Sequence, residues 1–282
     1  MSKIESETVN FFAQLIEKEI GIQYNAVNSH LLENRLHDLS KALGFDSFET
    51  FWAELKSRPL RASEKEAILD IATNNETSFF RDMEIFDFFR NDFLPKHTAN
   101  PLRVWCAATS TGQEPYSLAM VLAQLKDAGH PRSYEILATD FSERVLKQAQ
   151  SGIYSQLEVQ RGLSSAMLTR FFDPISDEKS TMAKFKIKAE LSSSITFRRL
   201  NLLDSWNHRD RFDIIFCRNV LIYQDLENKR KVIARLADAL TPGGYLVLGG
   251  AESLLGLSND FEMQIFGKAC VYKLKPNVRA SA

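Results

Sequence analysis

Apolar positions in the first quarter of the chain recur at intervals of three and four, the period of helices with one buried face. Gly21 and Gly44 suit the ends of two such helices, and Ser47 can cap a third. Ser63-Glu-Lys-Glu66 has the pattern of a capping box ahead of a fourth. No strand-like alternation interrupts this region. The pattern therefore predicts an all-α N-terminal domain over residues 1–72.

Residues 73–100 are expected to form a linker and a connecting helix. The stretch Thr73-Asn-Asn-Glu-Thr-Ser-Phe-Phe-Arg-Asp82 begins with residues that favour turns and continues into apolar positions at helical spacing. A helix that starts at the aromatic pair, with Thr77 or Ser78 as its cap, is the interpretation favoured by this spacing. Arg81 is unusual, because it places a cation among aromatic residues.

From residue 101 onward, short apolar runs alternate with helical patterns, which predicts a mostly parallel sheet with helices on both faces. The last run follows no clear helix, so we expect it to pair antiparallel at the sheet edge. Strands are predicted at 104–107, 134–139, 195–200, 212–217, 245–249 and 269–274. Helices are predicted at 115–126, 142–150 and 226–240, with Pro115 at the first helical position.

One segment of this domain, residues 157–194, is long for an α/β connection. It contains a helical pattern at 163–172 and a strict polar/apolar alternation at 183–188, which is typical of a half-exposed strand. We expect a small inserted antiparallel β-subdomain, although a surface hairpin without a functional role explains the pattern equally well. The fold class is thus α/β over residues 101–282, a Rossmann-like sheet with a small β insertion, preceded by helices.

Composition and charge exclude several classes of protein. The 282 residues carry a formal net charge of -1, so no global field attracts nucleic acid or membranes. Cys106, Cys217 and Cys270 lie in apolar runs without metal-ligand spacing, which predicts buried thiols in a reducing, cytoplasmic compartment. No apolar run is long enough to span a bilayer, and residues 1–7 lack the layout of a signal peptide.

The residues that follow the first four predicted strands are expected to line one crevice, because a parallel sheet forms its ligand site there. They are the turn 108–112 with Glu114, then Asp140, then Asn201-Leu202, then Arg218-Asn219. A carboxylate after the second strand can accept both hydroxyl protons of a ribose. Because the first turn has only one glycine, it matches neither the dinucleotide nor the P-loop motif. A nucleoside without phosphates, such as S-adenosylmethionine, fits better than NAD or ATP, although each piece alone is also compatible with an ordinary βα junction.

Several motifs together resemble the chemotaxis receptor glutamate methyltransferases, the CheR family, in a stand-alone form, from about residue 4 to residue 274. Residues 73–82 are similar to the family's T-N-x-T-x-F-F-R. Ala107-Ala-Thr-Ser-Thr-Gly-Gln-Glu-Pro-Tyr-Ser117 is similar to its A-G-C-S-T-G-E-E-P-Y-S, with Ala108-Thr109 in place of Gly-Cys. Phe216-Cys-Arg-Asn-Val-Leu-Ile-Tyr223 also matches, whereas Gly250-Ala-Glu252 replaces H-S-E.

The resemblance implies roles for ten residues around S-adenosylmethionine, whose product is S-adenosylhomocysteine; no metal is implied. Asn75, Thr77 and Arg81 would approach the methionine end, Glu114 its amino group and Asp140 the ribose. Asn201, Leu202, Arg218 and Asn219 would flank the adenine and the reacting centre. Arg81 and Tyr223 would orient the acceptor as catalytic residues. No general base is needed, because a glutamate side chain with a free pKa near ~4.3 is already ionised at neutral pH.

The implied partners are the cytoplasmic helical bundles of methyl-accepting chemotaxis receptors, with the enzyme recruited to membrane receptor arrays. Candidate contacts are basic residues of the helical domain, namely Arg35, Lys41, Lys56, Arg58 and Arg61. A receptor C-terminal peptide could add a strand to the insertion, and the sequence leaves this open. Two other interpretations stay open: methylation of an RNA base or a small molecule, and a non-catalytic sensor of the cofactor.

Overall fold

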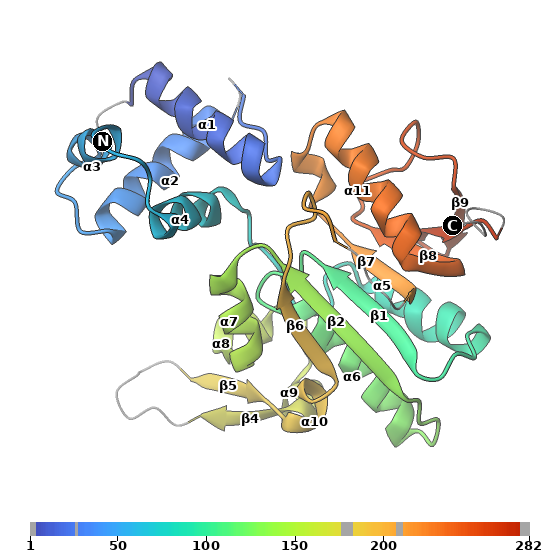
Figure 1. The fold of residues 1–282 in the computed structure, drawn as a ribbon. Coiled ribbons are helices and arrows are strands. Elements are labelled where there is room, and N and C mark those ends of the chain that lie inside the picture. Colours follow the sequence, from blue (N-terminus) through green and yellow to red (C-terminus); the bar gives the residue numbers. More distant parts are fainter. Residues whose placement is uncertain (1–3, 26–27, 176–182, 207–210, 277–282) are drawn as a thin grey trace. The chain divides into compact units, whose positions relative to one another are not determined.

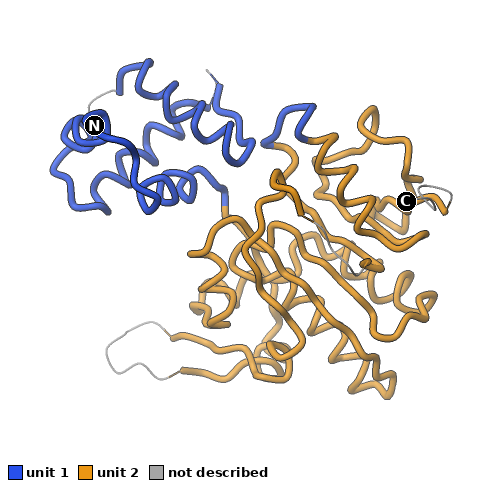
Figure 2. The backbone as a smooth tube through the Cα atoms, viewed as in Figure 1, with its two compact units in different colours: residues 1–74, 223–228 blue, residues 75–222, 229–282 orange. Residues whose placement is uncertain are grey.

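The computed structural model describes residues 4–25, 28–175, 183–206 and 211–276, and its chain divides into two compact units (Figure 2). The smaller unit comprises residues 1–74 and 223–228, and the larger comprises residues 75–222 and 229–282. Part of the expected β insertion, residues 176–182, lies outside the described residues. Among the described residues, no helix combines the length and the apolar character needed to cross a membrane.

The smaller unit contains four helices packed around Phe12, Leu36, Phe51 and Ile68, which are all buried. The helices are α1 (Ser6–Ile20), α2 (Ser29–Ala42), α3 (Phe48–Lys56) and α4 (Ala62–Ala72). Gly21, in the left-handed region at φ 72°, ends α1 as predicted.

Two predicted caps in this unit have different outcomes. Ser47 caps α3, since its hydroxyl accepts the Thr50 N–H. The expected box at 63–66 is wrong, because α4 begins earlier and Ser63 lies inside it. The Glu64 carboxylate accepts the Arg61 N–H at 2.9 Å, and this bond moves the start of the helix toward Arg61.

The larger unit is built on a seven-stranded sheet in the order β6-β2-β1-β7-β8-β10-β9 (Figure 1). The strands are β1 (Leu102–Ala107), β2 (Tyr134–Asp140), β6 (Ile195–Arg199), β7 (Phe212–Cys217), β8 (Leu240–Leu248), β9 (Phe261–Phe266) and β10 (Ala269–Leu274). The connecting helices are α6 (Gln113–Asp127), α7 (Glu143–Ser151) and α11 (Leu226–Ala239). Pairing is parallel from β6 to β8, and β10 is antiparallel to β8 and β9.

Successive residues of β1 point to opposite faces, so the sheet has a core on each side. Val104 and Cys106 belong to one cluster of buried residues, and Trp105 and Ala107 belong to the other. All four are almost completely buried, as expected for a central strand covered by helices. The prediction of a doubly covered, mostly parallel sheet is confirmed.

Several details of this unit differ from the predictions. Helix α6 begins at Gln113, so Pro115 stands inside the first turn rather than at its start. Strand β9 was not predicted, although Phe261–Phe266 alternates apolar and polar residues and Gly267 turns the chain into β10. Cys106 and Cys217 are buried as expected, but Cys270 is exposed, because it lies on a face of β10 that is uncovered at this position.

The inserted subdomain is a three-stranded antiparallel sheet in the order β3-β5-β4. Its strands are β3 (Ile153–Ser155), β4 (Phe172–Ile175) and β5 (Lys184–Ile187). Its helices are α8 (Gln156–Gln160), α9 (Ser165–Phe171) and α10 (Ala189–Ser192). Strand β3 precedes residue 157, so the small sheet begins upstream of the stretch whose length first indicated it.

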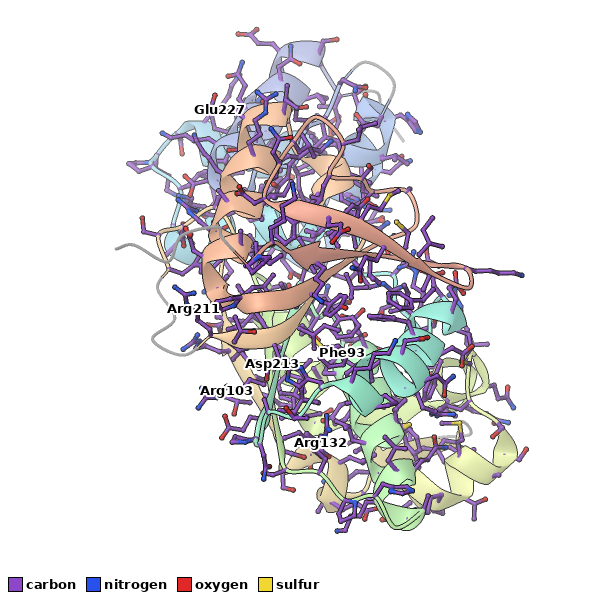
Figure 3. The ribbon with its side chains drawn as sticks, turned by 90° about the vertical axis from the view of Figure 1, so that its right-hand side faces the viewer. Phe93, Arg103, Arg132, Arg211, Asp213 and Glu227 are labelled. Atoms are coloured by element: carbon purple, nitrogen blue, oxygen red, sulfur yellow. The ribbon has the colours of Figure 1, made fainter. Side chains whose placement is uncertain are left out.

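The amino-terminal and carboxyl-terminal ends of the parallel strands form two opposite edges of the large sheet, and different residues lie at each. At the amino-terminal edge, the Arg103 N–H of β1 donates to the Asp213 carboxylate of β7 at 2.8 Å, and the two residues lie close together in Figure 3. Because β6, β2, β1 and β7 are parallel, their carboxyl ends meet at the opposite edge. The residues predicted to bind a ligand follow these ends.

Candidate active site

The turn after β1, residues 108–112, is held in place by α7 and by β3 of the inserted subdomain. Gly112 has φ 92°, and a Cβ there would lie 2.8 Å from the Cβ of Ala149 in α7. The Tyr154 hydroxyl, from β3, donates to the Thr111 carbonyl at 2.7 Å. Burial raises the pKa of Tyr154 well above its ordinary value, so this hydroxyl remains a donor. Glycine is therefore required at position 112 by close packing, not by a phosphate.

Asp140 and Ser110 connect the turn to the second strand and to the preceding linker. The Asp140 carboxylate accepts the Ser110 N–H at 2.8 Å and the Ser142 N–H at 3.0 Å. The Ser110 hydroxyl donates to the Asn75 carbonyl at 2.8 Å. Asp140 is buried, but a carboxylate can accept further bonds with its remaining lone pairs. Ser110 therefore connects Asn75 to Asp140, because its hydroxyl bonds the first residue and its N–H bonds the second.

Residues 75–82 form an extended turn rather than the predicted helix start. Helix α5 begins only at Met83, so Thr77 and Ser78 do not cap it. Phe80 adopts φ 51°, and its N–H donates to the Ser117 hydroxyl at 3.0 Å. After α5 (Met83–Phe88), the chain continues through a π-helical turn, η1 (Phe89–Phe93), and a 3₁₀ turn, η2 (Leu94–Lys96).

The insertion also fixes this turn. The Phe79 ring packs edge-on against Tyr154 and Phe172. Gly162 approaches Phe79 so closely that a Cβ would lie 1.9 Å from the Phe79 carbonyl oxygen. Arg161 pairs with Glu76 at 2.7 Å. Residues 161–162 therefore lie in direct contact with the backbone and a side chain of this turn.

Arg218 joins three segments at the carboxyl edge. Its NH1 group donates to Glu114 Oε2 at 2.9 Å, and its NH2 group donates to the Arg81 carbonyl at 3.0 Å and to the Asp82 carboxylate. The side chain is 4 % exposed. Burial alone lowers the pKa of Arg218, but the Glu114 and Asp82 carboxylates outweigh it and raise the pKa above the ordinary value. The guanidinium thus links Glu114, the expected partner of the cofactor's amino group, to the linker that carries Arg81.

The two residues expected to orient the acceptor belong to different units. Arg81 lies in the larger unit, where its NH1 group donates to the Glu76 carbonyl at 3.0 Å. That bond uses one of the five donors of a guanidinium. Tyr223 ends the 3₁₀ turn η3 (Leu221–Tyr223) and belongs to the smaller unit, where its hydroxyl accepts from Asn74 Nδ2 at 3.0 Å. The catalytic roles of both residues stay predictions.

The remaining predicted residues follow β6 and β7. The Asn201 side chain accepts the Leu203 N–H at 3.1 Å and Leu202 is buried, so the two residues shape a tight turn. Asn219 adopts φ 59° directly after Arg218. Its N–H donates to Glu252 Oε2 at 2.8 Å.

Backbone strain concentrates in these loops. Among the described residues, five non-glycine residues have positive φ, and all lie in the segments discussed above: Phe80, Asp82, Ala108, Ser110 and Asn219. Such conformations persist where the surrounding structure imposes them, and they cluster at functional sites. Ala108 stands where the resembling family has glycine, so this chain keeps a left-handed turn with a residue that disfavours it.

Sequence reasoning missed four residues that build the site, namely Asp82, Ser110, Tyr154 and Glu252. Each acts through backbone groups or a buried partner that is distant in the chain. Asp82, Ser110 and Glu252 lie within the motifs quoted above, but the motifs did not indicate their contacts, and Tyr154 lies outside those motifs.

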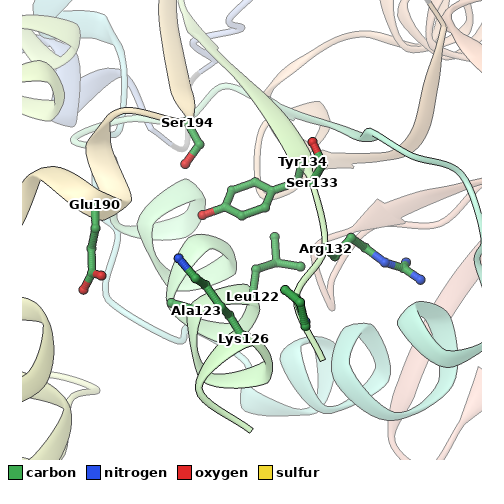
Figure 4. Close-up of a pocket in the computed structure, with 9 residues that line it drawn as sticks. Leu122, Ala123, Lys126, Arg132, Ser133, Tyr134, Glu190 and Ser194 are labelled. Atoms are coloured by element: carbon green, nitrogen blue, oxygen red, sulfur yellow. The ribbon is translucent and has the colours of Figure 1, made fainter. Parts of the chain in front are cut away.

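A separate pocket of about 370 Å³ lies away from these loops (Figure 4). It is lined by the end of α6, including Lys126, and by the start of β2, including Tyr134. Because β2 starts at the opposite edge of the sheet, this pocket does not contain the residues predicted to act on a ligand.

Family models match nearly the whole chain. The CheR methyltransferase all-alpha domain matches residues 7–73, and the CheR methyltransferase SAM-binding domain matches residues 75–269. The chain belongs to the CheR methyltransferase family. It therefore has the S-adenosylmethionine-binding domain of that family, which confirms the predicted cofactor.

Relatives of this CheR chain are similar to it in sequence over almost their full length. A chemotaxis protein methyltransferase of Vibrio parahaemolyticus is 37 % identical, covering 96 % of this chain and 98 % of the relative. A chemotaxis protein methyltransferase of Pseudomonas putida is 35 % identical over 94 % and 96 %. Among solved structures, magnesium protoporphyrin IX methyltransferase from Synechocystis, with bound SAM, has a TM-score of 0.42 at 16 % identity, covering 86 % of this chain and 96 % of that one.

The polar groups of the CheR site fit this cofactor. Among the described residues, Thr109 Oγ1 and Arg218 Nε are buried without a hydrogen-bond partner in the protein, and both belong to loops at the carboxyl edge. Carboxylates outnumber guanidinium groups here, with Asp82, Glu114 and Asp140 against Arg81 and Arg218, which suits a ligand with a positive sulfonium. The described part of the chain contains no cluster of three or more His, Cys, Asp or Glu side chains that could hold a metal ion.

Some basic residues of the CheR helical domain have internal partners. Arg35 donates to the Tyr24 hydroxyl and to the Ala72 carbonyl, both at 2.8 Å. Arg58 pairs with Glu54 and Glu64, and the Arg58 guanidinium is the main reason that the pKa of Glu64 falls to about 2. Because Arg35 and Arg58 serve the packing of this unit, they are weaker candidates for partner contacts.

Proposed function

We propose that this chain transfers the methyl group of S-adenosylmethionine to glutamate side chains of chemotaxis receptors and forms glutamate methyl esters. The observation that carries the proposal is the bridge from Glu114 through Arg218 to Arg81 and Asp82. It ties a residue expected at the cofactor's amino group to the residue expected to meet the acceptor. The family assignment and the chemotaxis names of the relatives support the same reaction.

The acceptor chemistry explains why the site needs orientation more than proton transfer. A glutamate carboxylate is ionised at neutral pH, with a free pKa near ~4.3, so no base has to activate it. It is a weak nucleophile, however, and holding reactants in attack geometry contributes on the order of 7–11 kcal/mol. Arg81 offers a forked donor that matches a carboxylate. Tyr223 would supply a second, neutral donor.

The chain's own residues would hold the cofactor at the carboxyl edge, where bound S-adenosylmethionine supplies an electrophilic methyl group. Asn75 and Thr77 would contact the methionine end, Glu114 the amino group and Asp140 the ribose. Asn201, Leu202 and Asn219 would flank the adenine and the reacting centre. Arg218 would complete this wall, since its pairing with Glu114 orients the carboxylate that faces the amino group.

The proposed partners are the cytoplasmic bundles of methyl-accepting receptors, to which the enzyme would be recruited from the cytoplasm. Lys41 and Arg61 are the preferred basic contacts; Arg61 is 65 % exposed and lies 3.7 Å from Glu64. A receptor C-terminal peptide could pair with an edge strand of the three-stranded sheet, because β3 and β4 form its two edges.

An acceptor experiment tests the proposal against its alternatives. The enzyme is incubated with methyl-labelled cofactor and, in separate reactions, receptor-containing membranes, total RNA and a small-molecule extract. We expect label on membrane protein that mild base releases as methanol, the behaviour of a methyl ester. Label on RNA or on small molecules would overturn the acceptor class, and cofactor binding without label transfer in any fraction would indicate a sensor.

A further inference from the structure

The Glu252 carboxylate, in the loop after β8, accepts five backbone N–H groups. Oε1 accepts from Val220, Leu221 and Ile222 at 3.0, 2.7 and 3.2 Å. Oε2 accepts from Asn219 and Gly249, both at 2.8 Å. One side chain therefore satisfies four consecutive amides of the turn that follows β7, as well as an amide of its own loop.

This turn contains a residue in the left-handed region, in close contact with the loop that carries Glu252. Asn219 has φ 59°, in the left-handed region. Gly249 comes so near that a Cβ there would lie 2.6 Å from Asn219 Nδ2 and 2.9 Å from the Asn219 backbone nitrogen. Five converging donors need an acceptor with two oxygens, which glutamate provides and glutamine does not. Glu252 thus holds the Asn219 backbone by a hydrogen bond, and Gly249 packs directly against Asn219.

We propose that Glu252 is a positioning residue for methyl transfer, which acts by fixing Asn219 and, one residue earlier, Arg218. The inference rests on the proposed function, because only that function places Asn219 and Arg218 beside the cofactor. The chain of contacts is continuous: Glu252 holds the Asn219 amide, and Arg218, directly preceding it, donates to Glu114. Motion of the turn would displace both side chains together.

The test compares Glu252→Gln with Glu262→Gln, a change of an exposed carboxylate on β9. Glutamine keeps the size of the side chain but turns an NH₂ group toward backbone donors. We expect Glu252→Gln to lower kcat/KM at least tenfold and to weaken S-adenosylhomocysteine binding severalfold in calorimetry, whereas Glu262→Gln matches wild type. A Glu252→Gln enzyme with wild-type kcat/KM and product affinity would overturn the inference.

A double-mutant cycle separates positioning from general stability. If Glu252 acts through Asn219, the losses in kcat/KM from Glu252→Gln and Asn219→Ala will be much less than additive when combined. Additive losses would refute the connection. Should Glu252→Gln fail to fold, Gly249→Ala displaces Asn219 by steric contact, and the same loss in kcat/KM is expected. Unchanged kinetics in that variant would contradict the inference.

The outcomes also distinguish this inference from the proposed function. If the wild-type enzyme binds no S-adenosylhomocysteine, the proposed function is wrong, and so is the role of Glu252. Wild-type enzyme that binds the product and methylates receptors, beside an equally active Glu252→Gln variant, would remove only the role of Glu252.

Discussion

Arg218 and Glu114, 104 positions apart in the chain, form a 2.9 Å ion pair, and their side chains are 4 % and 13 % exposed. Arg218 also holds Asp82 and the Arg81 carbonyl. The planar guanidinium gives one nitrogen to each of the two carboxylates in a fixed geometry, which the point charge of a lysine cannot do. The pair is thus the structural link between the cofactor wall and the linker.

Replacement of Arg218 should therefore affect stability and binding together. Removing one partner of a buried pair typically costs about 3–5 kcal/mol, because the other charge remains buried. We expect Arg218→Leu to lower the unfolding temperature strongly, and Arg218→Lys to lower it less while still weakening S-adenosylhomocysteine binding. Thermal unfolding and calorimetry measure both effects, with Lys147→Ala, an exposed residue of α7, as the control. Wild-type affinity in Arg218→Lys would contradict the link.

Arg81 should matter for turnover more than for folding. Its side chain is partly exposed and donates a hydrogen bond to the nearby Glu76 carbonyl. We expect Arg81→Ala to reduce receptor methylation by about 100-fold or more, because misplaced reactants lose rate on this scale. Arg81→Lys should recover only part of it, since a point charge lacks the fork. Lys126→Ala, at the opposite edge, serves as the charge control; near-normal turnover in Arg81→Ala would disprove the assignment.

Gly162 offers a test of how the insertion supports the linker. Gly162→Ala would place a methyl group 1.9 Å from the Phe79 carbonyl oxygen at φ 105°, whereas Gly129→Ala meets open space at φ 86°. Both variants incur the cost of a left-handed alanine, about 1–2 kcal/mol. Only Gly162→Ala should also weaken S-adenosylhomocysteine binding, by at least tenfold, because Asn75 to Arg81 would shift. Equal affinities of the two variants would show that the contact is unimportant.

Asp213 should make the stability of the larger unit dependent on acid pH. Burial raises the pKa of Asp213, but His97, 3.3 Å away, and the Arg103 N–H outweigh it and hold the pKa below its ordinary value. The stabilisation is therefore complete above the unfolded pKa of about 3.9 and is lost as the pH falls through the lower folded value.

The measurement is urea unfolding of wild type and Asp213→Asn at pH 7 and pH 3. The wild type should be more stable at pH 7, and its advantage should shrink at the lower pH. Asp87→Asn, which changes an exposed carboxylate of α5, should show no such gap. A gap that grows on acidification would reverse the sign of the argument.

Much of the sheet was predictable because its signals are local. Continuous apolar runs locate β1, β2 and β7, and Ser142 and Gly152 mark the two ends of α7. Parallel pairing then places Asp140 and Arg218 at one edge without further information. These features follow from periodicity and topology alone.

The linker was not predictable in the same way. Helical spacing links Phe79, Phe80, Phe86 and Phe89 in the sequence. Phe79 and Phe80 nevertheless lie in a turn ahead of α5, where tertiary contacts bury their side chains. The positive φ of Phe80 and the Ser117 bond that accompanies it have no signature in a single sequence. Glu252 was likewise hidden, since its five partners are backbone amides.

The most direct test of the account locates the transferred methyl group. Receptor-containing membranes are incubated with S-adenosylmethionine and the wild-type enzyme or Arg81→Ala, and receptor peptides are analysed by mass spectrometry before and after mild base. The account predicts a one-methyl mass increase on receptor glutamate side chains with wild type only, which base removes. A base-stable methyl group on another residue, or equal modification by Arg81→Ala, would contradict it.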